Sequence, residues 1–152
     1  MRCKAASLPL ELGRWRRYGR GHFRKSQRTQ RPSRTVERVP KIYKICSASA
    51  WREAEQQGVY RGSADDARDG FIHFSSAAQV KETARKHFLG QKALFLIEVD
   101  TEALGDRLRW ERSRNDELFP HLYGELDLGA VRAVRSLHAR SDGTHDIPEL
   151  IP

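Results

Sequence analysis

Two short segments of the sequence each place a histidine and a hydroxyl side chain two residues apart. The first, GFIHFS, holds His73 and Ser75, and the second, FPHLYG, holds His121 and Tyr123. Side chains alternate along a strand, so in extended backbone each pair would share one face. An imidazole beside a hydroxyl can hydrogen-bond a polar ligand or move a proton. A buried histidine satisfied by Ser75 or a backbone carbonyl is the structural alternative, but the duplication of the pattern favours a site.

The residues around His121 indicate how its segment runs. Pro120 is excluded from a helix interior and favours an edge or entry position of a strand. Gly124 permits a turn or the close approach of a ligand. The segment is therefore expected to be extended, with Leu122 on the face opposite to His121.

Strands dominate the predicted elements that must position these residues. The expected order is β-α-β-β-α-β-β, followed by the FPHLYG segment and one last strand. Because strands outnumber helices and do not alternate strictly with them, the fold class is predicted to be α+β rather than a doubly wound parallel sheet. The predicted strands are KIYKI (41–45), VYRG (59–62), GFIHFS (70–75), ALFLIEV (93–99), RLRWE (107–111) and RAVRSL (132–137).

Two helices and an acidic loop are predicted between the strands. Ser49 is expected to cap a helix through WREAEQQ, residues 51–57. Ser76 and Gln79 form the pattern of a capping box that opens the second helix. The stretch SADDARD, residues 63–69, is predicted to be an acidic loop.

The positive charge of the chain is confined to its first 40 residues. The net charge is +8, yet residues 41–152 contain 16 Lys and Arg against 18 Asp and Glu. Residues 1–40 contain 12 Lys and Arg against 2 acidic residues. A domain that begins at residue 41 would thus have no overall attraction for nucleic acid. The predicted organisation is an extension (1–40), one α+β domain (41–137) and a trailing C-terminal segment (138–152).

The N-terminal extension is rich in Arg and Ser and lacks an apolar period, so it is predicted to be disordered. Three interpretations remain open. The extension could be a non-functional segment that results from a start codon assigned too far upstream. Arg outnumbers Lys by 21 to 7 across the chain, as expected of a GC-rich coding bias, and such a segment would have this composition. It could be an organelle transit peptide. It could tether nucleic acid, with Trp15, Tyr18 and Phe23 stacking between arginines.

Several function classes lack their sequence signatures. The chain has no GxGxxG after a strand, no GxxxxGK[ST], and no CxxC, HExxH or GxSxG motif. Its longest apolar run, residues 93–97, is far shorter than the ~20 residues of a membrane span. Two cysteines, Cys3 and Cys46, suit neither a disulfide framework nor a metal site. A cytoplasmic protein with a small-molecule ligand and no membrane contact is expected.

Blocks of the sequence resemble a known family. IYKI, a tryptophan-led helix, YRGSADDARDGFIHFSSAAQVKETARKHF, LFLIEVD, LRWE and FPHLYGEL together resemble small bacterial proteins grouped as domain of unknown function 952 (DUF952). The resemblance spans residues 41 to about 137. That family is similar in fold to ADP-ribosyltransferases, and the block around His73 looks like a strand of RNA 2′-phosphotransferases. The resemblance implies a small split, curved sheet with a cleft that holds an NAD-like ligand.

The same resemblance implies roles for individual residues. Cleavage of the nicotinamide–ribose bond requires groups that hold the ribose, stack the nicotinamide and supply a carboxylate. The implied catalytic residues are His73, His121, Tyr123 and Glu111, with Glu111 as the carboxylate. The implied ligand-binding residues are Ser75, Tyr60, Gly62, Ser63 and Trp51, the Gly62-Ser63 turn offering amides to a diphosphate.

A binding module without chemistry is the competing hypothesis. His73 and His121 could join an acidic residue around a divalent metal, or the domain could hold a nucleotide and leave it unchanged. Ligand-type residues also gather near the C-terminus: His138, Asp142, His145 and Asp146. Because that segment is expected to trail from the domain, no metal site is predicted there.

Overall fold

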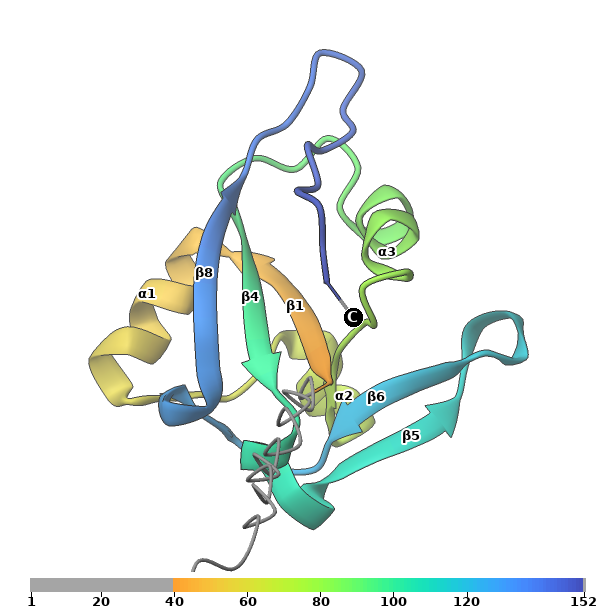
Figure 1. Ribbon diagram of the computed structural model, residues 1–152. Helices are drawn as coiled ribbons and strands as arrows, with labels where there is room; N and C mark the ends of the chain where they lie inside the picture. The colour runs from red at the N-terminus through yellow and green to blue at the C-terminus, as the bar shows by residue number, and fades with distance from the viewer. Residues whose placement is uncertain (1–39, 152) are drawn as a thin grey trace, which may run out of the picture. The chain divides into compact units, whose positions relative to one another are not determined.

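Residues 40–151, which the computed structural model describes, form three small antiparallel sheets and three α-helices (Figure 1). The sheets have the orders β1-β4-β8, β2-β7 and β3-β6-β5. The strands are β1 (Lys41–Ser47), β2 (Val59–Tyr60), β3 (Ile72–His73), β4 (Leu94–Asp100), β5 (Leu108–Arg112), β6 (Leu118–Leu122), β7 (Leu126–Asp127) and β8 (Val131–Leu137). The helices are α1 (Ala48–Gln57), α2 (Ala64–Asp69) and α3 (Val80–His87), and the 3-10 turns are η1 (Glu102–Arg107), η2 (Arg114–Asp116) and η3 (Leu128–Ala130). The α+β class is confirmed, and the N-terminal extension lies outside the described residues.

The sheet β1-β4-β8 separates two hydrophobic clusters. Ile42 and Trp51 belong to the cluster on the α1 side, and Tyr43 and Val80 belong to the cluster on the α3 side. Figure 1 accordingly shows α1 and α3 on opposite sides of this sheet. Strand β1, which its alternating sequence predicts to be half-buried, is covered on both faces, so even Lys44 is only 8% exposed.

Helix α1 begins earlier than the sequence predicts. Ser47, not Ser49, is the N-cap, and its hydroxyl accepts a hydrogen bond from the backbone N–H of Ala50. Ser49 lies within the helix, where its hydroxyl is 3.1 Å from that of Ser47. A serine two residues upstream fits equally well because capping requires only a short polar side chain before the first turn.

The predicted acidic loop is wrong, because residues 64–69 form helix α2. The Ser63 hydroxyl accepts from the N–H of Asp66, and the Asp66 carboxylate accepts from the N–H of Ser63, which completes a capping box. Gly70 ends the helix at φ 85°, a left-handed conformation that glycine adopts without strain. A run of acids thus caps a helix whose first turn favours negative charge.

Helix α3 is preceded by only half of the predicted capping box. The Gln79 side chain accepts a hydrogen bond from the N–H of Ser76, but no side chain caps the first turn, which starts at Val80. Val80 and Ala84 are buried against the sheet. The helix ends with Arg85, Lys86 and His87, and the charges of Arg85 and Lys86 complement the negative C-terminal end of the helix dipole.

A single bridge joins the first sheet to the third. Tyr43 of β1 and Ser75 exchange two backbone hydrogen bonds, each 2.9 Å long. Strand β3 then pairs with β6, and β5 and β6 extend away from the first sheet as an arm (Figure 1). The residues between these two sheets are therefore positioned by very short strands.

The C-terminal segment, predicted to trail from the domain, packs against it. Ala139 bridges to His145, and the imidazole Nε2 of His145 lies 2.8 Å from the carbonyl of Gln91. Ile147 packs against the cluster on the α3 side, and the hydroxyl of Tyr43 donates to the carbonyl of Ile151. Residues 138–151 are thus part of the folded unit.

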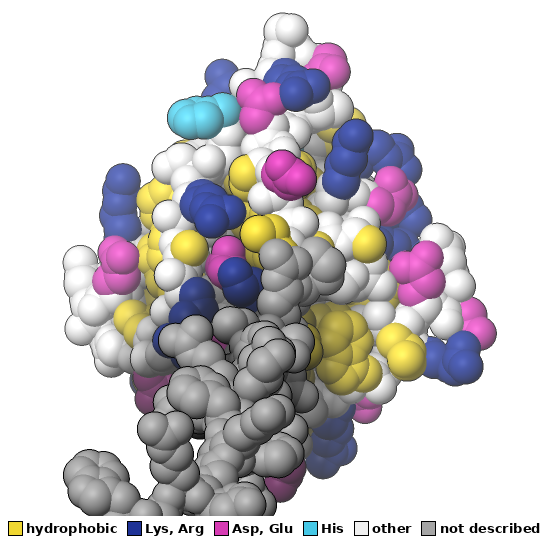
Figure 2. Space-filling model, viewed as in Figure 1, with side chains coloured by type: hydrophobic (Ala, Val, Ile, Leu, Met, Phe, Trp, Pro, Cys, Tyr) yellow, Lys and Arg dark blue, Asp and Glu magenta, His cyan; other side chains and the backbone are white. Residues whose placement is uncertain are grey.

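Opposite charges are mixed on one face of the folded part. On the face in Figure 2, the Lys and Arg side chains are interspersed with Asp and Glu rather than gathered in one field. This mixture agrees with the near balance of charges in residues 41–152. Among residues 40–151, no helix combines the length and apolar character that crossing a bilayer requires.

Candidate functional site

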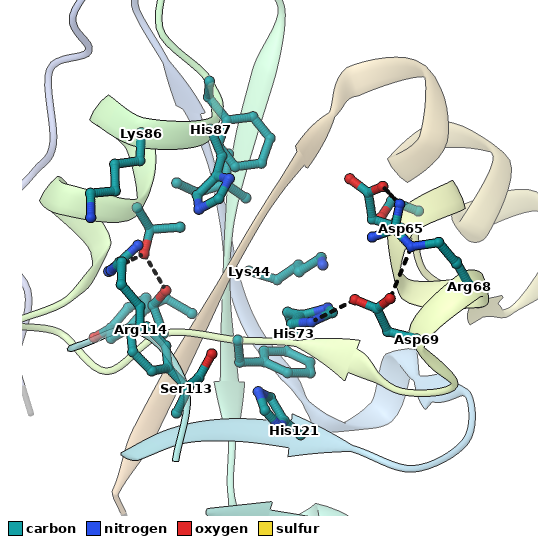
Figure 3. Close-up of a pocket in the computed structure, with 18 residues that line it drawn as sticks. Lys44, Asp65, Arg68, Asp69, His73, Lys86, His87, Ser113, Arg114 and His121 are labelled. Carbon is teal, nitrogen blue, oxygen red and sulfur yellow. Dashed lines mark hydrogen bonds and ion pairs between the residues drawn. The ribbon is translucent and has the colours of Figure 1, made fainter. Parts of the chain in front are cut away.

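A cavity of about 490 Å³ opens where α2, α3 and the bridge between the sheets meet. Its volume falls in the range of roughly 300–1,000 Å³ that is usual for small-molecule sites. His73 of β3 and His121 of β6 both line it, together with Ser63, Ser75 and Phe119 (Figure 3). The two histidines pair directly across the antiparallel strands, and their ring centroids lie 5.2 Å apart, edge to face.

His73 is held by Asp66. Its Nδ1 lies 2.7 Å from Asp66 Oδ1, which also accepts the backbone N–H of His73 at 3.1 Å. The Nε2 atom, on the far side of the ring, lies 3.4 Å from Asp69 Oδ2. A carboxylate at Nδ1 accepts the N–H there and so fixes the orientation of the ring.

Asp66 also binds Lys44, which makes it the centre of a buried network. Asp66 Oδ2 lies 2.7 Å from Lys44 Nζ, and the Asp66 side chain is only 2% exposed. Burial alone would raise the pKa of Asp66. The hydrogen bond from His73 and the charge and hydrogen bond of Lys44 outweigh burial and hold the pKa well below its usual range. Asp66 is thus a carboxylate at any pH near neutrality.

The backbone before α2 leaves no room for a side chain at position 62, which is Gly62. Gly62 has φ 94°, and a Cβ built on it would lie 2.7 Å from the Cβ of Asp66. Only glycine therefore lets the chain turn so closely over this carboxylate. Gly62 shapes the site but does not line the cavity, in contrast to the adjacent Ser63.

His121 has its own carboxylate, Glu111 of β5. His121 Nδ1 lies 2.8 Å from Glu111 Oε2, and the Tyr123 hydroxyl donates to both carboxylate oxygens at 2.9 and 3.1 Å. These hydrogen bonds, that of His121 first, lower the pKa of Glu111, and the same carboxylate raises the pKa of Tyr123. Glu111 and Tyr123 do not line the cavity. They contact it through His121.

Phe71 packs against both histidines and against Tyr123. Its ring stacks on His121 with centroids 4.2 Å apart and tilts against His73 at 4.7 Å and Tyr123 at 5.3 Å. The flat ring restricts how far either imidazole can rotate. Both histidines are consequently fixed from the carboxylate side and from the aromatic side.

Trp51 and Tyr60 are placed in the core instead of the cavity. Each is 2% exposed, their ring centroids lie 6.1 Å apart, and both belong to the cluster on the α1 side. A ligand in the cavity cannot reach rings that are covered by the sheet. Ser75 does line the cavity, and its hydroxyl lies 3.0 Å from that of Thr83.

Sequence reasoning missed several cavity or network residues, among them Lys44, Asp66, Asp69 and Arg114. The spacing of Ser63 and Asp66 is a helix-start signal that could have revealed α2. Once α2 is known to end beside β3, an acidic side chain near His73 follows. Lys44 gave no such signal, since an alternating strand predicts its side chain to be solvated.

Two other chemistries find no support in the described part of the chain. Burial raises the pKa of the Cys46 thiol to about 12, so it is no nucleophile at neutral pH. Within residues 40–151, no three His, Cys, Asp or Glu side chains converge closely enough to hold a metal ion. The same holds for the C-terminal residues His138, Asp142, His145 and Asp146, which lie within this range.

The chain is similar to known proteins over the region that builds the cavity. The family described as "Protein of unknown function (DUF952)" matches residues 45–134. The crystal structure of protein CC0527 from Caulobacter crescentus is 45% identical, with a TM-score of 0.68, over 70% of this chain and 93% of that chain. The solution NMR structure of CC0527 is 46% identical, with a TM-score of 0.62, over 68% of this chain and 90% of that chain. No curated protein matches the chain.

Proposed function

The chain belongs to the DUF952 family, and we propose that it is a small-ligand enzyme of ADP-ribosyltransferase-like fold that acts on NAD or a related nucleotide in the cavity. One observation carries the proposal. His73 and His121 line the same cavity, and each is held at Nδ1 by a carboxylate, at 2.7 and 2.8 Å. Two oriented imidazoles in one hollow are suited to acid–base work or to holding ribose hydroxyls.

The acidic groups of the cavity suit the chemistry of a glycosidic bond. Breaking the bond between nicotinamide and ribose develops positive charge on the sugar, which a nearby carboxylate stabilises. Glu111, the carboxylate implied by the family resemblance, is turned toward His121 and Tyr123. Asp69 and Asp65 line the cavity, and Asp69 is the one beside His73 Nε2. Asp69 therefore takes the role in the proposal that the sequence suggested for Glu111.

Release of nicotinamide from NAD tests the proposal. In His73→Ala the rate should fall roughly 10²- to 10⁴-fold, the usual contribution of a positioned acid–base group. His138→Ala is the matched control, because His138 is exposed and outside the cavity, and it should retain the rate. Circular dichroism must show that both variants are folded.

The outcomes separate an enzyme from a binding module. Thermal stabilisation by NAD or ADP-ribose without any turnover would support a non-catalytic nucleotide-binding protein instead. If these ligands caused neither stabilisation nor turnover, both hypotheses would be rejected. Equal rates in His73→Ala and His138→Ala would remove His73 from the reaction.

A further inference from the structure

The charges of the cavity are segregated between its two ends. Arg68, Asp65 and Asp69 lie together at the α2 end, and Lys86, His87 and Arg114 lie at the other end, next to α3 (Figure 3). At the α2 end, Arg68 bonds Asp65 at 2.8 Å and Asp69 at 3.0 Å, so its charge is offset. The opposite end carries an excess of positive charge.

Arg114 distinguishes this basic group from an ordinary helix end. Lys86 and His87 alone would only complement the dipole of α3. Arg114, however, comes from the turn η2 between β5 and β6, and no carboxylate among residues 40–151 forms a salt bridge with it. Its guanidinium lies over the Phe119 ring at 4.8 Å and donates to the Thr83 hydroxyl at 3.4 Å. An aromatic face and a hydroxyl thus hold an arginine that keeps donors to spare.

The backbone after Arg114 makes a tight hairpin turn between β5 and β6. Asn115 and Asp116 have φ of 55° and 61°, the left-handed conformation that such a turn requires and that Asn and Asp adopt more readily than other residues with a side chain. Two hydrogen bonds from Arg112 to Asp116 hold this turn. The N–H of Glu117 donates to the carbonyl of Arg114 across the turn at 3.1 Å, so the turn fixes the backbone of the residue that presents a guanidinium to the cavity.

The neighbouring groups are those that an oxyanion requires. Lys86 is only loosely paired, with its Nζ 3.6 Å from Glu82. Burial, Arg114 and Lys86 lower the pKa of His87, so the positive potential at this end disfavours a further proton. The hydroxyls of Thr83 and Ser75 and the side chain of Ser113 add neutral polar groups between this end and the histidines. Arg114 and Lys86 together supply two positive charges.

We propose that Arg114 and Lys86, with His87 at their side, form a subsite for a phosphate or diphosphate that carries two negative charges in total, and that the substrate is consequently a phosphorylated sugar or nucleotide. This proposal rests on the proposed function, because it assigns an orientation to the ligand of the same cavity. The phosphate lies at the α3 end, and the reacting sugar lies at His73 and Asp69. The group is either the diphosphate that bridges two nucleosides or a terminal phosphate.

Binding of matched ligand pairs tests the subsite. Ribose 5-phosphate is compared with ribose, and ADP-ribose with adenosine, by isothermal titration calorimetry on the full chain. The phosphorylated member of a pair should bind more tightly, and its affinity should fall as salt is added. Preference for ADP-ribose identifies a bridging diphosphate, and preference for ribose 5-phosphate identifies a terminal phosphate. Equal affinity within both pairs would overturn the subsite.

Variants then assign the binding to the named residues. Arg114→Gln and Lys86→Gln should each raise the Kd of the phosphorylated ligand roughly 10- to 100-fold, as the loss of a charge-assisted contact does. Arg52→Gln on α1 and Lys81→Gln on α3 remove equal charges from exposed sites outside the cavity and should leave the Kd unchanged. Lys86 is exposed, so its variant tests the subsite even if Arg114→Gln does not fold.

The results distinguish failure of the subsite from failure of the proposed function. Nicotinamide release from NAD with a Kd that neither variant changes would overturn the subsite and leave the enzyme in place. Loss of affinity in Arg114→Gln and Lys86→Gln, without any turnover by the unmodified chain, would support the subsite and remove the reaction. Equal losses in the variants and both controls would mean a diffuse charge effect, which overturns the subsite.

Discussion

The two histidine–carboxylate pairs have similar hydrogen bonds but very different surroundings. Asp66 is 2% exposed at its side chain and binds Lys44, Ser63 and His73. Glu111 is 36% exposed at its side chain and binds only His121 and Tyr123 among the described residues. The first carboxylate is built into the interior, and the second lies on the β5–β6 arm. Removing the first carboxylate should damage both fold and site, whereas removing the second should damage the site alone.

The largest effect is expected for Asp66→Asn. The substitution leaves the buried ammonium of Lys44 without a counter-charge, which typically costs about 3–5 kcal/mol of unfolding free energy. Urea denaturation measures this loss. Asp65→Asn is the control, since Asp65 is a neighbour whose side chain is 74% exposed, and its stability should match the unmodified chain. Similar denaturation curves for the two variants would show that the buried network stabilises nothing.

The buried carboxylate of Asp66 should also make the stability of the fold sensitive to acid. Folding lowers the pKa of Asp66 from 3.8, so its contribution to stability is complete above pH 3.8 and is lost as the pH falls further toward the folded value. The urea midpoint should therefore decline steeply below that pH in the unmodified chain. Asp66→Asn should show a shallower decline. An equally steep decline in both would assign the acid sensitivity to other carboxyl groups.

Glu111→Gln is expected to preserve the fold and reduce turnover. The amide cannot act as the same charged acceptor for His121 Nδ1, so the ring loses its fixed orientation. Nicotinamide release should fall roughly 10- to 100-fold, a part of what positioned acid–base groups provide, while the thermal midpoint stays close to that of the unmodified chain. Glu125→Gln, which removes an exposed partner of Arg61, serves as the control. A fall in stability as large as that of Asp66→Asn would erase the proposed difference between the pairs.

The smallest effect is expected for Tyr123→Phe. The ring would keep its contacts with Phe71 and with the Arg109 guanidinium, which lies 4.7 Å from the ring centroid. Only the hydroxyl bond to Glu111 is lost. Because that bond lowers the pKa of Glu111, the pKa should rise toward 4.5 in the variant, as carbon-13 NMR of the carboxyl can measure. An unchanged pKa would mean that His121 alone orders this carboxylate.

From the sequence, it was possible to predict which side chains share a face with each histidine, but not which other strands and carboxylates lie beside them. Alternation along a strand placed His73 with Ser75, and the structure has both side chains at the cavity. It could not show that His73 lies directly opposite His121, because the register of two strands far apart in the sequence depends on the whole sheet. The carboxylate of Asp66 was missed for a related reason. A six-residue helix has too few turns for a periodic pattern, so residues 64–69 resembled a loop.

For the aromatic residues, the sequence could not distinguish a position in the core from a position in the cavity. Trp51 and Tyr60 are the types that stack on a nucleotide, but the same types fill a core. Which of these they do depends on how α1 packs on the sheet, and α1 buries both rings. Propensity and alternation describe one element at a time, whereas these positions are decided by contacts between elements.

The bridge between Tyr43 and Ser75 allows opening of the cavity to be measured without any ligand. Two backbone amide protons alone tie one sheet to the other at this point, and both residues line the hollow. Any widening that separates the sheets must break those bonds. The rate of deuterium exchange at these two amides, measured by NMR in the ligand-free protein, would accordingly report how often the two sheets separate.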